Sequence, residues 1–326
     1  MLGYYSLNKE MWSSVVTRKR EDYMEWSRTH FINLEYWEDV GDVTIISEEM
    51  SSLEKQSYKQ IIIDVKRTNP EEVFALKVLK DMLVRMLFVW AFKHPSSGYV
   101  QGMNDIAATF MYVFLAEAVY EKKHSKPTSS ELNEDDLLTS GYNLIIDDVA
   151  LLSEETLANI EADTFWWMES FLETLQENYI NKQPGIYKIL NKVELIIKKK
   201  DMDLIEILSS IDYLPEKFVY RWINNILSRE FSIQQLIKIW DRILSEEQEV
   251  SNCLWYVWAA LLLMFAKDLK DLAETPDEII MYLQDLPTYK WNDEDIKMLM
   301  AEGYQLKTYY QNNKHLSLMD GKNSTA

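Results

Sequence analysis

The chain has 326 residues, 47% of them hydrophobic, which is enough to build the core of one large domain or of two modest ones. It contains only 8 glycines and 7 prolines, a scarcity that disfavours a turn-dense all-β protein and favours long helices. The formal net charge of −19 disfavours binding to nucleic acids and to anionic membrane surfaces, because both require clustered lysine and arginine side chains.

The single cysteine, Cys253, begins the most apolar run of the chain, residues 253–266. One cysteine cannot form a disulfide within the chain, so a reducing, cytoplasmic compartment is expected. The run is shorter than the roughly 20 residues that a membrane span needs, so we expect a buried helix and no transmembrane segment. The N-terminus lacks the apolar core of a signal peptide.

Helix signals can be followed along the chain. Asn69-Pro70-Glu71-Glu72 offers an N-cap, a first-turn proline and a carboxylate ahead of an amphipathic segment, which should end near His94-Pro95. Pro215 opens another helix, a capping box at Ser232–Gln235 a third, and Thr275-Pro276 a fourth. No convincing run of strands accompanies them. The sequence therefore predicts an all-α fold.

Two segments read as exposed chain. Residues 122–148 are polar and acidic and contain proline and glycine, which indicates a surface loop or insertion. Residues 311–326 form a polar tail. No internal repeat of roughly 30–45 residues is evident, which disfavours a helical solenoid.

Arg67 is the first candidate for chemistry. It belongs to the block IIIDVKRT at 61–68 and lies just before a predicted helix start, where a long side chain can reach a partner. A guanidinium group is planar, always charged and able to bridge two phosphate oxygens. Asp64, three residues earlier, is placed to orient it. Taken alone, such a pair is more often a solvated surface ion pair.

Gln101 is the second candidate, within the block SGYVQGMND at 97–105. It lies between Gly98 and Gly102, and glycine permits backbone conformations that other residues resist. A helix is predicted to begin near Asn104 or Asp105, so Gln101 sits on a tight turn at a helix entrance. Taken alone, it would be an ordinary loop amide.

An arginine and a glutamine on two loops form a complete set for stimulated GTP hydrolysis. That reaction needs charge stabilisation and an oriented water rather than covalent catalysis. The chain has no G-x-x-x-x-G-K-[ST] loop, so we expect it to bind no nucleotide of its own and no cofactor. Its four histidines show no paired metal-ligand spacing, and Cys253 lies where a thiolate is disfavoured. No metal site or nucleophile is therefore expected.

These blocks resemble the TBC domain of Rab GTPase-activating proteins over nearly the whole chain, about residues 1–310. IIIDVKRT fits the arginine-finger pattern IxxDxxRT, and SGYVQGMND fits the glutamine-finger pattern YxQ. The segment FVYRWINNILSREFSIQQLIKIWDRIL at 218–244 also matches, at positions that include Arg221, Trp222, Trp240 and Asp241. HPxSGYVQG(I/M)ND is similar to the Golgi-type Rab GAP subfamily.

The resemblance implies one all-helical, V-shaped TBC domain over residues 1–310. Its N-terminal lobe, about residues 1–180, would carry the fingers, and its C-terminal lobe would span residues 181–310. The groove between the lobes would receive a GTP-bound Rab, to which GTP and Mg²⁺ belong. Such a protein would switch off Rabs of vesicle trafficking. It would be cytoplasmic and associate with Golgi or other endomembranes through its partners.

The resemblance also assigns roles to residues. Arg67 and Gln101 would enter the GTPase site, the glutamine replacing the Rab's own. The finger loops would be supported by Asp64, Thr68, Gly98, Tyr99, Gly102, Asn104 and Asp105. Structural rather than catalytic roles are expected for Arg221, Trp222, Trp240 and Asp241.

Two departures from the family pattern leave alternatives open. Relatives usually have a further helix before the segment with which this chain begins, and many have proline where Lys66 stands. A loosened finger loop would favour a second class of function, a TBC-like scaffold that binds a Rab or an adaptor without accelerating hydrolysis. A third reading is an all-α interaction domain with no GTPase partner.

Overall fold

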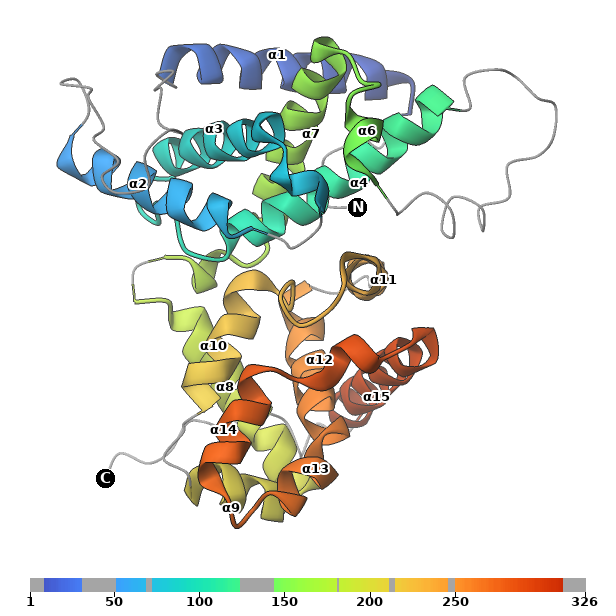
Figure 1. Cartoon of the computed structure of the whole chain (residues 1–326). Helices are drawn as coiled ribbons and strands as arrows, with labels where there is room; N and C mark the ends of the chain where they lie inside the picture. The colour runs from blue at the N-terminus through green and yellow to red at the C-terminus, as the bar shows by residue number, and fades with distance from the viewer. Residues whose placement is uncertain are drawn as a thin grey trace. The chain divides into compact units, whose positions relative to one another are not determined.

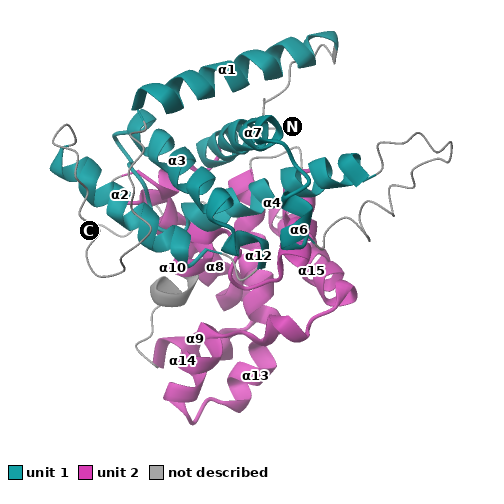
Figure 2. Cartoon of the chain, turned by 45° about the horizontal axis from the view of Figure 1, so that its top comes forward, with its two compact units in different colours: residues 1–173 teal, residues 174–326 magenta. Residues whose placement is uncertain are grey.

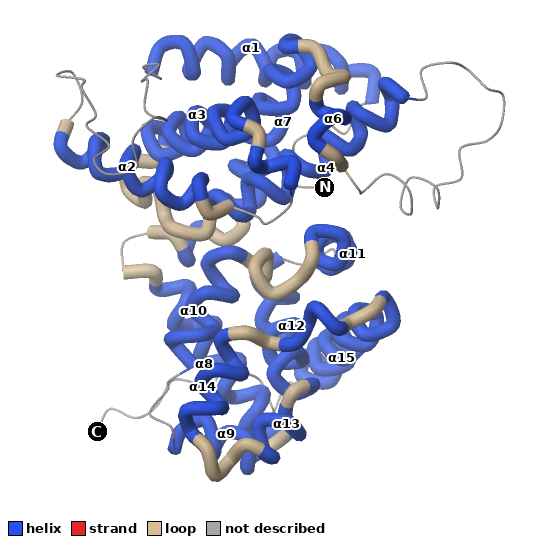
Figure 3. The backbone as a smooth tube through the Cα atoms, in the orientation of Figure 1, coloured by secondary structure: helices blue, strands red, loops and turns tan. Residues whose placement is uncertain are grey.

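The computed structural model describes residues 9–30, 51–68, 72–123, 144–180, 182–210, 215–245 and 250–312. Throughout these ranges the regular structure is helical and no strand occurs (Figure 3). The all-α class predicted from the sequence is confirmed. The chain divides into two compact units, residues 1–173 and 174–326 (Figure 2). The single domain over 1–310 and the lobe boundary near residue 180 stay predictions.

The first unit is a bundle in which α7 packs against α1, α3 and α4, while α2 packs against α3. In chain order its elements are η1 (Lys9–Met11), α1 (Trp12–His30), α2 (Ser52–Lys66), η2 (Glu72–Ala75), α3 (Lys77–Lys93), α4 (Met103–Lys123), α6 (Ile146–Val149) and α7 (Glu154–Glu173) (Figure 1). Helices α3 and α4 are apolar on most sides, which is typical of helices enclosed by others.

Two carboxylates on α7 hold the neighbouring helices. Glu161, 3% exposed, accepts two bonds from the guanidinium of Arg85 on α3, at 2.6 and 2.5 Å, and one from the hydroxyl of Tyr23 on α1. The carboxylate of Asp163 likewise accepts two hydrogen bonds from the guanidinium of Arg20 on α1, at 2.9 and 2.5 Å. Burial, together with Glu161, raises the pKa of Tyr23 well above its usual value, so this hydroxyl stays a donor.

Helix α3 begins later than the sequence predicts. Residues 69–71 lie outside the described residues, Glu72 belongs to the short η2, and α3 starts only at Lys77 after Leu76 in an extended conformation. Val73 and Phe74 are buried, so this short 3-10 turn already packs into the core before the α-helix begins. The predicted end is confirmed: the backbone N–H of His94 donates to the Trp90 carbonyl at 3.0 Å, and Pro95 follows.

The second unit is built around α12, which packs against α8, α11 and α15. Its elements are η3 (Gln176–Asn178), α8 (Pro184–Lys200), α9 (Met202–Ser210), α10 (Pro215–Asn225), α11 (Ile233–Leu244), α12 (Val250–Met264), α13 (Ala266–Asp271), α14 (Pro276–Gln284), η4 (Pro287–Lys290) and α15 (Asp293–Asn312). Helix α15 lies close to α12 at Gly303, which has no side chain. A Cβ built there would be only 3.4 Å from the Val257 side chain.

The helix signals read in this part of the sequence are confirmed. Pro215 opens α10 and Thr275 precedes Pro276 at the start of α14. Ser232 and Gln235 form the capping box of α11, with bonds of 3.3 and 3.1 Å. The apolar run that begins near Cys253 is the buried helix α12. Among the described residues, no helix is long and apolar enough to cross a membrane.

Helices extend a short way into both the predicted insertion and the predicted tail. Helix α4 continues through Lys123, which pairs with Asp148 of α6, so both ends of the segment 122–148 are anchored. The remainder of that prediction, residues 124–143, lies outside the described residues. Helix α15 continues to Asn312, two residues into the predicted tail, and residues 313–326 again lie outside the described ranges.

The Glu161 cluster generates a prediction about stability. Replacing Arg85 by Met would leave an almost fully buried carboxylate without its cation, which typically costs about 3–5 kcal/mol. We expect the first unit of Arg85→Met to unfold at a markedly lower urea concentration, measured by far-UV circular dichroism. The control is Lys77→Met, which removes an exposed pair with Asp81 and should change stability by no more than about 0.5 kcal/mol. Equal midpoints for the two variants would contradict this role.

Candidate functional site

Arg67 caps the C-terminus of α2. Its backbone N–H donates to the carbonyl of Asp64 at 3.0 Å, while its side chain is exposed. Among the described residues, no side chain forms a hydrogen bond or ion pair with its guanidinium group. Lys66 is the last residue of α2, so the helix continues up to the arginine itself. Arg67 is thus a cation projecting from a firmly held helix end.

Two roles were expected for Asp64, orienting Arg67 and supporting the finger loops, and its observed contacts agree with the second. Its carboxylate is 2% exposed and accepts from the amide of Gln60 at 3.0 Å and from the hydroxyl of Tyr99 at 2.9 Å. It therefore does not orient the guanidinium of Arg67; it ties the end of α2 to the segment that carries Tyr99. Gln60, one helical turn before Asp64, was missed by the sequence reading, and its spacing of four residues was the available signal.

Gln101 lies on a turn between two glycines with positive φ, +61° at Gly98 and +106° at Gly102. These values favour glycine, because a Cβ disfavours the left-handed region. The N–H of Gly98 donates to the carbonyl of His94 at 2.8 Å, which anchors the turn to the end of α3. The side chain of Gln101 is exposed and bonds to no other described residue.

The buried side chain of Asn104 forms hydrogen bonds with both loops. The residue is fully buried, and its amide nitrogen donates to the Thr68 hydroxyl at 2.8 Å and to the Asp105 carboxylate at 3.0 Å. Its amide oxygen accepts the backbone N–H of Gly102 at 3.2 Å. Thr68 in turn donates to the carbonyl of Asp64 at 3.0 Å. One side chain therefore satisfies polar groups of the arginine loop and of the glutamine turn at once.

The predicted finger-loop residues thus meet in one network, which leaves Arg67 and Gln101 projecting outward. Such an arrangement can present a permanent cation and a neutral amide to a partner without breaking internal bonds. The described residues contain no cluster of histidine, cysteine or carboxylate side chains that could hold a metal ion.

The predicted structural residues of the second unit divide into two groups. Trp222 is fully buried, and the indole N–H of Trp240 donates to the carbonyl of Ile226 at 3.1 Å. Arg221 pairs with the buried carboxylate of Glu230 at 2.6 Å. Asp241 differs, because its side chain is exposed and bonds to no other described residue.

Glu230 matters because its carboxyl group is desolvated. Burial raises its pKa above the ordinary 4.5, while the neighbouring Arg221 acts in the opposite direction. Arg221 also donates to the carbonyl of Gln284 at 2.9 Å, which joins the end of α14 to α10. These contacts support the fold of the second unit rather than any chemistry.

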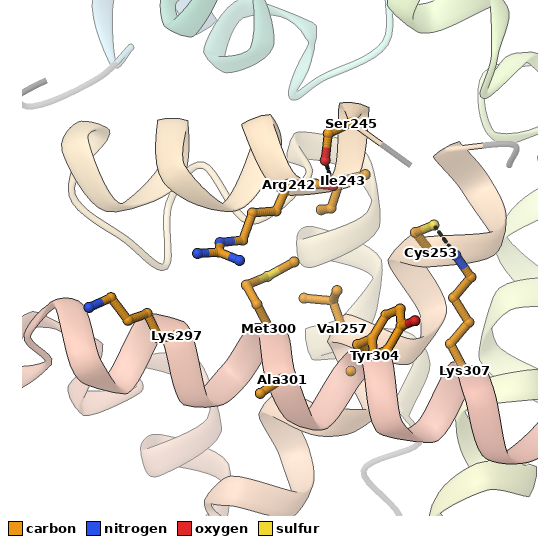
Figure 4. Close-up of a pocket in the computed structure, with 11 residues that line it drawn as sticks. Arg242, Ile243, Ser245, Cys253, Val257, Lys297, Met300, Ala301, Tyr304 and Lys307 are labelled. Carbon is orange, nitrogen blue, oxygen red and sulfur yellow. Dashed lines mark hydrogen bonds between the residues drawn. The ribbon is translucent and has the colours of Figure 1, made fainter. Parts of the chain in front are cut away.

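A cavity of about 290 Å³ in the second unit is the other candidate site (Figure 4). It lies among α11, α12 and α15, with Arg242, Lys297 and Lys307 in its lining. Lys297 is already paired with Glu294 at 2.7 Å, and Lys307 donates to the Cys253 sulfur at 3.7 Å. Because two of these three cations are engaged by protein groups, the cavity is a weaker candidate than the two loops.

Comparison with known proteins connects the chain to one family. The model of the Rab-GTPase-TBC domain matches residues 5–270. The human protein TBC1 domain family member 22B is 34% identical over 308 residues, 94% of this chain and 53% of that protein. The GTPase-activating protein gyp1 of Schizosaccharomyces pombe is 32% identical over 314 residues, 95% of this chain and 54% of that protein. The chain thus spans about half the length of these relatives.

A solved structure is similar over nearly the whole chain. The crystal structure of the Ypt/Rab-GAP domain of Gyp1p superimposes with a TM-score of 0.77 at 30% sequence identity. The match covers 95% of this chain and 86% of that one. The helical fold is therefore that of this solved domain.

The buried network makes Asn104 a test of loop coupling. Asn104→Ala would leave the N–H of Gly102 and the carboxylate of Asp105 short of a partner, at about 1–3 kcal/mol for each buried group. We expect a lower free energy of unfolding and faster hydrogen exchange at the Gly102 amide. The control Asn159→Ala removes a half-buried amide on α7 and should change neither quantity. Unchanged exchange at Gly102 in Asn104→Ala would contradict the coupling.

The Arg221–Glu230 pair predicts a pH dependence. A carboxyl group with a raised folded pKa favours the folded state when protonated, so its contribution is lost as pH rises above about 4.5. Arg221→Met removes the opposing cation, so we expect a loss of about 3 kcal/mol at pH 8 and a smaller loss at pH 5. Thermal unfolding at both pH values measures this. Lys297→Met, which breaks an exposed pair, is the control, and a pH-independent loss in Arg221→Met would be the contrary result.

Proposed function

The chain belongs to the Rab-GTPase-TBC domain family, and on that premise we propose that it accelerates GTP hydrolysis by a GTP-bound Rab GTPase. The observation that carries the proposal is that Arg67 and Gln101 are both exposed, bond through their side chains to no other described residue, and lie on loops that share one buried network. The relatives named as GTPase-activating proteins and the similar Rab-GAP domain support the same activity.

Arg67 would act on the charge that develops during hydrolysis. In phosphoryl transfer to water, negative charge spreads over the phosphate oxygens, and a guanidinium delivered by a second protein stabilises it. An arginine supplied in this way typically contributes a factor of about 10³–10⁵ in rate. That factor corresponds to roughly 4–7 kcal/mol of activation free energy. No covalent intermediate with this chain is required.

Gln101 would orient the attacking water. A neutral amide can donate a hydrogen bond to one oxygen and accept one from a water at the same time. It therefore fixes the direction of attack without adding charge to an already anionic site. Because the amide bonds to no other described residue, it can be engaged by the partner without a compensating loss inside this chain.

The supporting residues make these two groups cooperate. Asp64 and Tyr99 hold the arginine loop beside the glutamine turn, and Asn104 bonds to both loops. Preorganisation of this kind means that the loops need not be ordered at the moment of binding. In this proposal GTP and Mg²⁺ remain with the Rab, and this chain supplies side chains alone.

The proposal includes a cellular role. A Rab whose GTP is hydrolysed is switched off, so the protein would end a step of vesicle trafficking on Golgi or other endomembranes. A net charge of −19 opposes direct attraction to anionic lipid, so recruitment would come from the Rab or an adaptor. Tight binding of the isolated protein to anionic liposomes would argue against this part.

The catalytic roles are tested by phosphate release from a panel of GTP-loaded Rabs. We expect wild-type protein to accelerate one or a few Rabs, Arg67→Ala to lose that acceleration by about 10³-fold or more, and Gln101→Ala to lose most of it. Arg67→Lys should fail to restore the rate, because an ammonium cannot bridge two oxygens as a guanidinium does. Arg28→Ala, which removes an exposed arginine of α1, is the matched control.

The result also separates the alternatives. If a well-folded wild-type protein accelerated no Rab but bound one, the scaffold function would replace the catalytic one. If changing both Arg67 and Gln101 altered neither binding nor hydrolysis, an interaction domain without a GTPase partner would be the better account.

A further inference from the structure

Helix α2, labelled in Figure 1, ends just before Arg67. It carries an exposed row of side chains that leads to this arginine. Lys59, Ile63 and Arg67 follow one another at intervals of four residues, so they share one face of the helix end. All three are exposed. The opposite side of the helix is buried against the first unit through Tyr58, Ile61, Ile62 and Val65. We call Lys59, Ile63 and Arg67 the α2 face.

Ile63 is the unusual member of this face. It is 40% exposed, although its two predecessors, Ile61 and Ile62, are fully buried. A single exposed apolar residue is common on protein surfaces and means little alone. Its position is what matters, because four residues of helix place it only about 6 Å along the axis from Arg67. Any partner that receives the Arg67 guanidinium must pass close to this side chain.

The charge around α2 is opposite to that of the whole protein. From Glu54 to Arg67 the chain carries Lys55, Lys59, Lys66 and Arg67 against Glu54 and the buried Asp64. Four cations and two anions give +2, in a chain whose net charge is −19. The ammonium of Lys59 and the guanidinium of Arg67 bond to no other described residue. Helix α2 with Arg67 is thus locally basic in an acidic protein.

We propose that the α2 face is a docking surface for the GTP-loaded GTPase, and this inference rests on the proposed function. The partner that fits it has acidic side chains around a small apolar contact, close to its nucleotide pocket. Lys59 guides that surface toward the loops by long-range attraction. Ile63 packs against the apolar contact, and the two together place Arg67 at the phosphates.

The test separates docking from chemistry by measuring KM and kcat for a Rab that the wild type accelerates. We expect Ile63→Asp to raise KM about tenfold or more with kcat within about twofold, because the side chain binds the partner and does not touch the phosphate. We expect Lys59→Glu to lower kcat/KM several-fold at low salt, with the difference shrinking at high salt.

Leu53→Asp is the matched control. Leu53 is 76% exposed on the same helix but lies ten residues, about 15 Å, from Ile63. The Leu53→Asp variant should leave KM, kcat and thermal stability unchanged. Because Ile63 and Lys59 are exposed, their variants should also keep the wild-type melting temperature. An unaltered KM in both face variants, or an equal rise in Leu53→Asp, would overturn the proposal.

Two further measurements test docking at the α2 face independently of the proposed acceleration of GTP hydrolysis. If the wild type accelerates no Rab, the function fails, and docking is then tested by affinity for Rabs loaded with a non-hydrolysable GTP analogue. Weaker binding by Ile63→Asp in that assay would uphold the α2 face, and unchanged binding would overturn it. Analytical sedimentation of wild type and Ile63→Asp tests whether the α2 face binds a second copy of this chain instead. If the wild type is a dimer and Ile63→Asp a monomer, the face belongs to that dimer interface and the proposal is overturned.

Discussion

The side chain of Asn104 is the contact on which the arrangement of the two loops depends. It bonds to Thr68 at the end of α2 and to Gly102 in the turn before α4, segments that are 36 and 2 residues away in sequence. A buried amide is costly unless its donors and acceptor are used, and here they are. Because the loops are held from within, the exposed side chains of Arg67 and Gln101 need no bond to another described residue to keep the loops in place.

Buried charge performs a comparable task in each unit. On α7, Glu161 forms an ion pair with an arginine of α3, and Asp163 forms one with an arginine of α1. Each carboxylate therefore holds one neighbouring helix against α7. In the second unit, Glu230 receives Arg221, and Trp240 bonds the carbonyl of Ile226 just after α10. Breaking one side of such a pair costs more than the pair contributes, since the remaining charge stays buried. These residues therefore specify packing more than they add stability.

The residues proposed for function are the least constrained by the fold. Arg67, Gln101, Ile63 and Lys59 are all exposed, and replacing them should disturb little inside the protein. The net charge of −19 opposes electrostatic attraction of the chain to anionic surfaces, while the basic helix α2 can attract a suitably charged protein. Recognition in the proposed function would thus be local, and the reaction would depend on positioning rather than on a perturbed titratable group.

The sequence by itself determined the all-α class, the helix end at His94, the capping box at Ser232 and the identity of the two candidate finger residues. Each of these depends on patterns within a few residues or on motifs in fixed order. The family resemblance named Asp64 and Tyr99 as supports of the two loops, but only the tertiary structure decided that they bond to each other and that Asp241 lies exposed. The reason is physical: a hydrogen bond between residues 35 positions apart exists only once the packed helices bring them together.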